Sequence, residues 1–222
     1  MSSTTAQLSP ALTLYTYFQS SAAFRVRIAI NLKGLKPSQS FVHLLHHEQS
    51  NDAYRRLNPQ AIVPTLVHDG RALGQSLAII EYLDAIVPEP PLLPGDPFGR
   101  AHVRQIAYAI ACEVHPLCNL RVREYLRDNM NWSKSELVQW QHHWIGLGLS
   151  ATEQLVGDGR FCHGNTPTLA DIILIPQLAN ARRAELELAP YPKLLRIEKA
   201  AYELAAFRDA QPQNQPDATP AA

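Results

Sequence analysis

The chain has 222 residues, 46% of them hydrophobic and 18% charged, so it can bury the core of one large domain or of two modest ones. Its 20 basic residues balance 20 acidic ones, which excludes the strong positive field with which proteins gather nucleic acid or anionic membranes. No apolar run approaches the roughly 20 residues that cross a bilayer, and the first residues lack a signal-peptide pattern, so we expect a cytoplasmic protein with neither nucleic acid nor membrane as a partner.

The three cysteines, Cys112, Cys118 and Cys162, form no CxxC pair and are too few for a disulfide framework. We expect all three to be reduced. A lone cysteine in a helical pattern is usually a small buried apolar residue, so none is assigned a catalytic role.

The two ends of the chain, residues 1–11 and 210–222, are rich in small and polar residues and have no periodic apolar positions, which predicts flexible tails. The run LTLYTYF at 12–18 mixes β-branched and aromatic residues and predicts a buried strand. A helix is predicted directly after it, at 22–32, ending before Gly34.

A second strand is predicted at 40–45 and a short helix at 51–57. Asp69-Gly70 then marks the turn of a β-hairpin, which is followed by an amphipathic helix at 76–87. The predicted order is therefore β-α-β-α-β-β-α.

Residues 88–99 contain five prolines and two glycines, a composition that continues neither a helix nor a strand. Beyond them the strand patterns stop, and helices are predicted at 98–130, 134–156, 169–185 and 192–208. We therefore expect an α/β domain at 12–90, a linker at 91–97 and an all-helical domain at 98–209. Thr168 and Asp171 form a capping box at the start of the third of these helices.

Ser20 and Ser21 lie where the first strand ends and the first helix begins. Their hydroxyls and the free N–H groups of the first helical turn favour an anion, and a thiolate placed there would have its pKa lowered from about 8.5. A Ser-Ser pair before a helix is also an ordinary N-cap, and this segment alone leaves both interpretations open.

Two further turns carry backbone or hydroxyl groups that could bind a ligand. Val63-Pro64 precedes a strand, where a cis peptide would explain the proline, although a trans turn proline is the commoner event. Gln75-Ser76 opens the next helix, where the hydroxyl and the N–H groups can bind a carboxylate or simply cap the helix.

In the helical half, His115 and Asn119 are four residues apart and are expected on one helix face, with Pro116 bending that helix. A planar guanidinium group can bind a carboxylate through two hydrogen bonds, so the arginines of the chain are candidates for holding an acidic ligand. For each arginine, an ordinary solvent-exposed surface position is the alternative.

No metal site is predicted, because His43, His46 and His47 lack a suitably spaced carboxylate or cysteine partner. The sequence contains neither a P-loop nor a GxGxxG motif, so a phosphate-containing cofactor has no expected cradle.

Seven segments in the same order and spacing resemble the zeta class of glutathione transferases, which contains the maleylacetoacetate and maleylpyruvate isomerases. They are SSAAFRVRIAINLKG at 20–34, NPQAIVPTL, GQSLAIIEYLD, LLPGDP, HPLCNLRVREYL, TPTLADIILIPQLANARR and APYPKLLRIEKAAYELAAF. The resemblance implies a thioredoxin-like α/β domain followed by an all-α helical bundle domain, in a homodimer.

The resemblance also implies glutathione as the cofactor and a small dicarboxylate as the substrate of a cis-trans isomerisation. Ser20 and Ser21 would stabilise the glutathione thiolate. The implied glutathione contacts are Val63, Pro64, Gln75, Ser76, His115 and Asn119. The implied contacts with the substrate carboxylates are Arg121, Arg183 and Arg25, and Arg182 and Arg27 are further candidates.

Two positions depart from the class pattern, since Ala22 stands where the signature has cysteine and Gln19 where the isomerases usually have arginine. Glutathione brings its own sulfur, so the missing arginine matters more, because it would grip a substrate carboxylate. Two alternatives follow, a general glutathione transferase or peroxidase and a glutathione-binding protein without catalysis.

Overall fold

The structure is a computed structural model that describes residues 12–218. The described chain forms two compact units. Unit 1 contains the residues up to Ile86 together with those from Ala210 onward, and unit 2 contains Val87–Asp209. Within the described chain, no helix is long and apolar enough to cross a bilayer.

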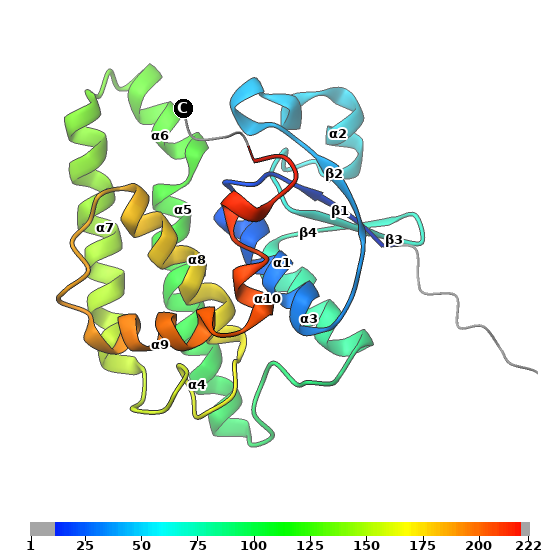
Figure 1. The fold of residues 1–222 in the computed structure, drawn as a ribbon. Coiled ribbons are helices and arrows are strands. Elements are labelled where there is room, and N and C mark those ends of the chain that lie inside the picture. The colour runs from blue at the N-terminus through cyan, green and yellow to red at the C-terminus, as the bar shows by residue number, and fades with distance from the viewer. Residues whose placement is uncertain (1–11, 219–222) are drawn as a thin grey trace, which may run out of the picture. The chain divides into compact units, whose positions relative to one another are not determined.

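Unit 1 is a four-stranded sheet with helices, coloured blue to cyan in Figure 1. Its elements are β1 (Leu12–Thr16), α1 (Ser21–Leu32), β2 (Ser38–Phe41), α2 (Asp52–Leu57), β3 (Thr65–His68), β4 (Arg71–Gly74) and α3 (Ser76–Ile86). The strand order is β2-β1-β3-β4, with β1 parallel to β2 and antiparallel to β3. This confirms the predicted β-α-β-α-β-β-α order and the thioredoxin-like expectation.

The sheet and the two long helices enclose the core of unit 1. Leu14 of β1 and Leu66 of β3 are register partners, and both side chains are fully buried. Helices α1 and α3 pack against each other (Figure 1), and α1 is buried along nearly its whole length from Ser21 to Ile30. Burial of this apolar surface stabilises the unit and fixes where α1 begins.

Both early strands end sooner than predicted. β1 stops at Thr16, because the chain turns there and the Ser20 N–H donates to the Tyr17 carbonyl at 3.0 Å. β2 occupies Ser38–Phe41 instead of 40–45, and a Glu48 carboxylate oxygen accepts the His43 N–H at 2.6 Å just beyond it. Apolar residues in these runs therefore pack in turns as well as in strands.

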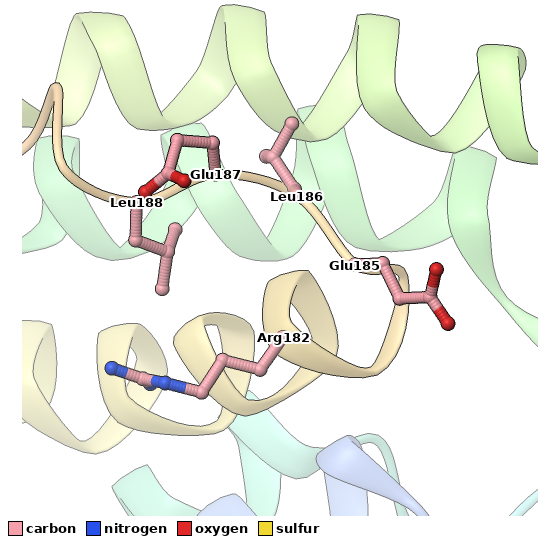
Figure 2. Close-up of a pocket in the computed structure, with 5 residues that line it drawn as sticks. All are labelled: Arg182, Glu185, Leu186, Glu187 and Leu188. Carbon is pink, nitrogen blue, oxygen red and sulfur yellow. The ribbon is translucent and has the colours of Figure 1, made fainter.

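Unit 2 is all-helical. Its helices are α4 (Pro97–Tyr108), a π-helical stretch (Ala109–Val114), α5 (His115–Cys118), α6 (Leu120–Asn129), α7 (Lys134–Leu155), α8 (Leu169–Arg183), α9 (Pro192–Tyr202) and α10 (Ala205–Arg208). The connection from α8 to α9 borders a cavity of about 350 Å³ lined by Arg182, Glu185, Leu186, Glu187 and Leu188 (Figure 2).

Helix α8 lies in the core of unit 2, and its start confirms the predicted capping box. The buried Asp171 carboxylate accepts the Thr168 N–H and hydroxyl and, through its other oxygen, the Cys162 N–H at 2.8 Å. Burial raises the pKa of Asp171, while these hydrogen bonds oppose the shift. The local sequence therefore fixes both the helix start and the loop that precedes it.

The prediction that residues 91–97 lie between the two domains is wrong, because these residues belong to unit 2. Leu92 is 2% exposed, and its carbonyl accepts the Leu169 N–H at 2.9 Å, so the proline-rich segment packs into unit 2. Prolines prevent regular structure there without preventing burial.

The predicted tail at 210–222 is also wrong where the structure describes it. Residues 210–218 pack into unit 1, with Ala210 at 1% and Gln215 at 8% exposed. The predicted tail at 1–11 and the last four residues lie outside the described residues.

Candidate functional site

Ser20 is the N-cap residue of α1. Its hydroxyl oxygen accepts the Ala23 N–H at 3.2 Å, and its carbonyl accepts the Phe24 N–H at 2.8 Å. The side chain is half-buried, and within residues 12–218 its hydroxyl hydrogen has no acceptor. Capping uses the oxygen as an acceptor and leaves the O–H as a donor, so one side chain can cap the helix and also bind an anion.

The neighbours of Ser20 differ in accessibility. Ser21 is the first residue of α1 and is 8% exposed, whereas Gln19 is exposed on the preceding turn. Ala22 is half-buried and contributes no polar side chain to this helix end. Ser20 is therefore the better placed of the two serines to donate to a ligand.

Val63 packs near the turn that leads to Ser20, and hydrogen bonds to the preceding residue fix its backbone. The Tyr54 hydroxyl and the Asn58 amide both donate to the Ile62 carbonyl, at 2.7 and 2.9 Å. Both also contact the Thr65 hydroxyl, so the segment before β3 is fixed on two sides. Burial raises the pKa of the Tyr54 phenol, which keeps it neutral in this network.

The Val63-Pro64 peptide is cis, which is one of the two forms that the sequence left open. Within the described chain, the Val63 N–H and carbonyl have no hydrogen-bond partner. Backbone groups without a partner in the chain can pair with an extended peptide.

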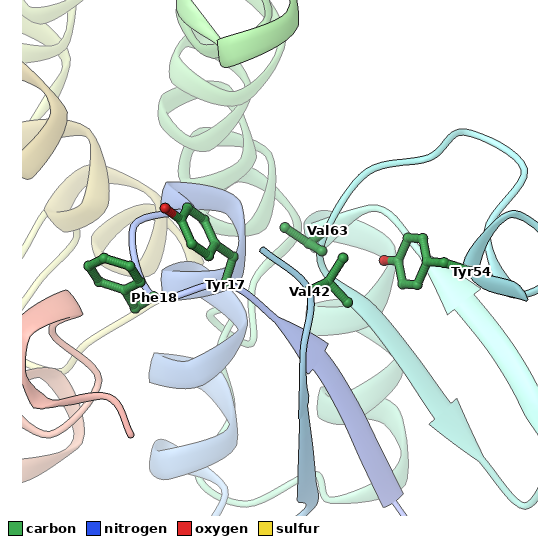
Figure 3. Close-up of a cluster of buried hydrophobic side chains, with 5 residues drawn as sticks. All are labelled: Tyr17, Phe18, Val42, Tyr54 and Val63. Carbon is green, nitrogen blue, oxygen red and sulfur yellow. The ribbon is translucent and has the colours of Figure 1, made fainter. Parts of the chain in front are cut away.

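A cluster of buried side chains joins these two segments. It contains Tyr17, Phe18, Val42, Tyr54 and Val63 (Figure 3). Tyr17 and Phe18 belong to the turn that leads to Ser20, while Val63 precedes the cis-proline. The structure thus packs the turn that leads to Ser20 into the same cluster as Val63, although the two segments lie far apart in the chain.

The start of α3 is a third segment that carries predicted site residues. Ser76 is the first residue of α3, and the preceding Gln75 has a φ of 68° and donates through its side-chain amide to Gln60 at 2.7 Å. Arg25 of α1 lies behind this helix end, with Nη1 at 3.4 Å from the Ser76 hydroxyl oxygen. A helix N-terminus and a guanidinium together favour a carboxylate.

This placement corrects the prediction for Arg25. The residue is 2% exposed, so it does not reach a substrate from the surface of α1. Its contact is with the Ser76 hydroxyl. The sequence signal for this was available, since a charged residue on a helix that is apolar all round must be buried with polar partners.

The predicted pairing of His115 and Asn119 on one helix face is wrong. Helix α5 ends at Cys118, and Asn119 is extended, with ψ at 166°. The Asn119 side chain caps α6, accepting the Val122 N–H at 3.1 Å, and also donates to the Pro116 carbonyl at 3.0 Å. Because asparagine prefers helix starts to helix interiors, the predicted long helix breaks where the asparagine follows the proline.

The arginines of unit 2 have different surroundings. Arg121 is exposed on α6, and Arg183 is exposed at the end of α8, where it donates to the Asn180 side chain. Arg182 is bound through both terminal nitrogens to the Glu198 carboxylate. Of the arginines considered for the substrate carboxylates, Arg182 alone lines the cavity in Figure 2.

The histidines of the described chain do not assemble a metal centre. His43 and His46 stack on each other with ring centroids 3.8 Å apart. In residues 12–218, no group of three or more His, Cys, Asp or Glu side chains is arranged to hold a metal ion.

The sequence of this chain matches family models and known proteins over most of its length. Residues 14–91 match the family model for the glutathione S-transferase N-terminal domain, and residues 148–210 match that for the C-terminal domain. A maleylacetoacetate isomerase of Pseudomonas aeruginosa is 46% identical over 214 residues, which cover 94% of this chain and 99% of that protein.

Two solved structures are similar over almost the whole chain. One is a holo maleylpyruvate isomerase, a bacterial zeta-class glutathione S-transferase, with a TM-score of 0.91 and 42% identity over 93% of this chain and 100% of that one. The other is a maleylacetoacetate isomerase of Anaeromyxobacter dehalogenans with dicarboxyethyl glutathione and citrate in its active site, with a TM-score of 0.85 and 44% identity over 96% and 99% of the two chains.

Proposed function

Because this chain belongs to the glutathione S-transferase family, we propose that it is a glutathione-dependent cis-trans isomerase of a maleyl-substituted diketo acid, such as maleylacetoacetate or maleylpyruvate. The main support from the site is the Ser20 hydroxyl, which caps α1 and keeps its hydrogen for an anion. A thiol-using enzyme needs such a donor, because only the thiolate is a good nucleophile.

Glutathione supplies the sulfur: its thiolate adds to the activated cis double bond, rotation occurs about the resulting single bond, and elimination leaves the trans product. Dicarboxyethyl glutathione, the ligand of the A. dehalogenans relative, is the kind of adduct that forms when a thiol adds to a butenedioic acid. The protein has to stabilise the thiolate, orient the peptide and hold the carboxylates of the acid.

Ser20 stabilises the thiolate in this proposal. Its O–H would donate to the sulfur, and the start of α1 contributes partial positive charge. Both effects favour the charged form and lower the pKa of the bound thiol towards neutrality. Ser21, being buried, would support this turn rather than touch the sulfur.

The rest of the tripeptide would be held by backbone and helix-end groups of unit 1. The unpaired Val63 N–H and carbonyl suit the cysteinyl part of glutathione, with Pro64 fixing their direction. Gln75 and Ser76, with Arg25 behind them, suit the γ-glutamyl carboxylate.

Unit 2 would supply the remaining contacts. His115 and Asn119 are proposed for glutathione, although capping α6 already uses part of the Asn119 side chain. Arg121 and Arg183 are proposed for the substrate carboxylates, because both are exposed and a planar guanidinium group suits a carboxylate. The family resemblance further leads us to propose a homodimer located in the cytoplasm.

The direct test gives the purified chain enzymatically prepared maleylacetoacetate and maleylpyruvate, each with and without glutathione, and follows the loss of substrate absorbance. We expect the chain to isomerise at least one of the two acids, and to do so only when glutathione is present. If the chain binds glutathione but isomerises neither acid, the isomerase proposal is wrong.

The same preparation distinguishes the alternatives. Conjugation of an electrophilic aryl halide without isomerisation would indicate a general transferase, and retention on immobilised glutathione without any turnover would indicate a binding protein. Restoring the class residue with Gln19→Arg tests whether the missing arginine sets the preferred acid, through the ratio of kcat/KM for the two substrates.

A further inference from the structure

The last described residues form a strap over unit 1. We use "C-terminal strap" for residues 210–218, which include a short 3₁₀ turn at Pro212–Asn214. The strap is held internally, since the Gln215 amide donates to the Gln211 carbonyl at 2.9 Å and the Ala218 N–H donates to the Gln215 carbonyl at 3.0 Å. In Figure 1 it is the red segment that lies against α1.

Arg27 of α1 connects the start of the strap to the turn before Ser20. Its Nε donates to the Ala210 carbonyl at 3.0 Å. Its two terminal nitrogens donate to the carbonyls of Tyr17 and Phe18, at 3.3 and 3.0 Å. The side chain is 3% exposed. This one buried guanidinium therefore links α1 to the Tyr17–Phe18 turn and to the start of the strap.

Asp217 connects the end of the strap to the same turn. One carboxylate oxygen accepts the Phe18 N–H at 2.9 Å, while the other is buried. Burial lowers the pKa of Arg27 to about 10, and the negative charge of Asp217 works against that shift. The strap therefore supplies the charge that compensates the buried arginine.

The apolar end of the strap packs at the same place. Ala218 lies against the cluster of Tyr17, Phe18, Val42, Tyr54 and Val63, and Figure 3 shows the strap next to Phe18. Both the carbonyl and the N–H of Phe18 are thus bound, two residues before Ser20. The Ser20 N–H in turn donates to the Tyr17 carbonyl.

We propose that Arg27 and Asp217 are positioning residues, which hold the Tyr17–Ser20 turn so that the Ser20 hydroxyl points at the glutathione sulfur. The inference rests on the proposed use of Ser20 as the thiolate donor. The C-terminal strap is on this account part of the thiol-activating machinery.

Loss of Asp217 should act on thiol activation rather than on substrate recognition. Without its carboxylate the Phe18 N–H loses its partner, and Arg27 loses a compensating charge. A misplacement of about 1 Å can cost on the order of 100-fold in rate, so a kcat reduced about tenfold is expected, with the KM for the acid substrate nearly unchanged.

The test compares Asp217→Ala, Asp217→Asn and the matched control Asp158→Ala. Asp158 lies in unit 2, and its carboxylate is 90% exposed. The pKa of the bound glutathione thiol is measured for each protein from the ultraviolet absorbance of the thiolate against pH. Hydrogen exchange of the Phe18 and Ser20 amides is followed in the same proteins without ligand.

For Asp217→Ala we expect a higher pKa of the bound thiol, an approximately tenfold smaller thiolate fraction at neutral pH and faster exchange of both amides. Asp217→Asn keeps an acceptor for the Phe18 N–H and should recover part of the effect, while Asp158→Ala should match the parent chain. An unchanged thiol pKa in Asp217→Ala overturns the inference.

The thiol pKa and the amide exchange test the positioning role of Arg27 and Asp217 separately from the isomerase activity. A parent chain that lowers the pKa of bound glutathione but isomerises nothing contradicts the isomerase proposal, and the variants still test the strap. If Asp217→Ala does not fold, the milder Asp217→Asn decides, because an unchanged thiol pKa and unchanged exchange in that variant also contradict the positioning role. A parent chain that leaves the pKa of bound glutathione unchanged contradicts both the role of Ser20 and the inference about the strap, whether or not it isomerises the acids.

Discussion

Replacing Ser20 with alanine removes two functions of one hydroxyl group. As an acceptor, it caps α1 by binding the Ala23 N–H at 3.2 Å. As a donor, it is proposed to stabilise the glutathione thiolate. Ser20→Ala should therefore lower both the stability of the fold and the reactivity of the bound thiol, and the two losses can be estimated separately.

Loss of an N-cap costs about 1 kcal/mol of folding free energy. For a chain of this length, that should lower the midpoint of thermal unfolding by about 2–4 °C. A hydrogen bond to a charged group contributes about 1.5–3 kcal/mol, and the half-exposed position of Ser20 favours the lower figure. Since 1.36 kcal/mol corresponds to about one pKa unit, the thiolate fraction at neutral pH should fall about tenfold.

The assay records kcat against pH for the parent chain and for Ser20→Ala. In the parent chain, kcat should rise with pH up to the lowered pKa of the bound thiol and then level off. In the variant the rise should move to higher pH, because the thiol pKa is higher. The deficit should therefore be about tenfold at neutral pH and should shrink in alkaline buffer.

Ser133→Ala is the matched control, because Ser133 caps α7 by accepting the Glu136 N–H at 3.3 Å in unit 2. It should lower the thermal midpoint by a similar amount without changing the thiol pKa. A Ser20→Ala protein with the kcat–pH profile of the parent would refute the role of the hydroxyl. A profile shift shared by Ser133→Ala would assign the effect to lost stability.

Three other outcomes are expected. Arg25→Met removes the guanidinium behind the Ser76 hydroxyl and should raise the KM for glutathione about tenfold more than it lowers kcat; equal changes in both would contradict a binding role. Asp171→Ala leaves three donors without their acceptor and should lower the free energy of unfolding by about 2–4 kcal/mol, measured by urea denaturation. In a titration with a thiol reagent, the exposed Cys112 should react rapidly, whereas Cys162 should react only after unfolding, because it is buried and burial raises its pKa; rapid reaction of Cys162 in the native chain would refute this.

Local patterns account for the features that the sequence predicted well. The Asp69-Gly70 hairpin, the Ser20 cap and the Thr168–Asp171 capping box each depend on residues within about four positions of each other. The seven segments that resemble the transferase family likewise identified the fold, which the family matches confirm. Such features need no knowledge of where the rest of the chain lies.

The predictions that failed depended on burial. Arg25 was expected to reach a substrate, but α1 is covered on nearly all sides, so its guanidinium lies behind the start of α3. Leu92 was assigned to a linker, yet it is buried against the start of α8. A composition rich in proline predicts the absence of a helix, and it does not predict exposure.

By itself, the sequence determined the order of elements in unit 1, the starts of most long helices and the family to which the chain belongs. Only the tertiary structure decided that residues 210–218 return to the turn before Ser20. The contacts from Arg27 to Ala210 and from Phe18 to Asp217 join residues 183 and 199 positions apart. The secondary-structure propensities of neighbouring residues cannot predict such a pairing, because the buried guanidinium and the distant carboxylate come close only when the core between them has formed.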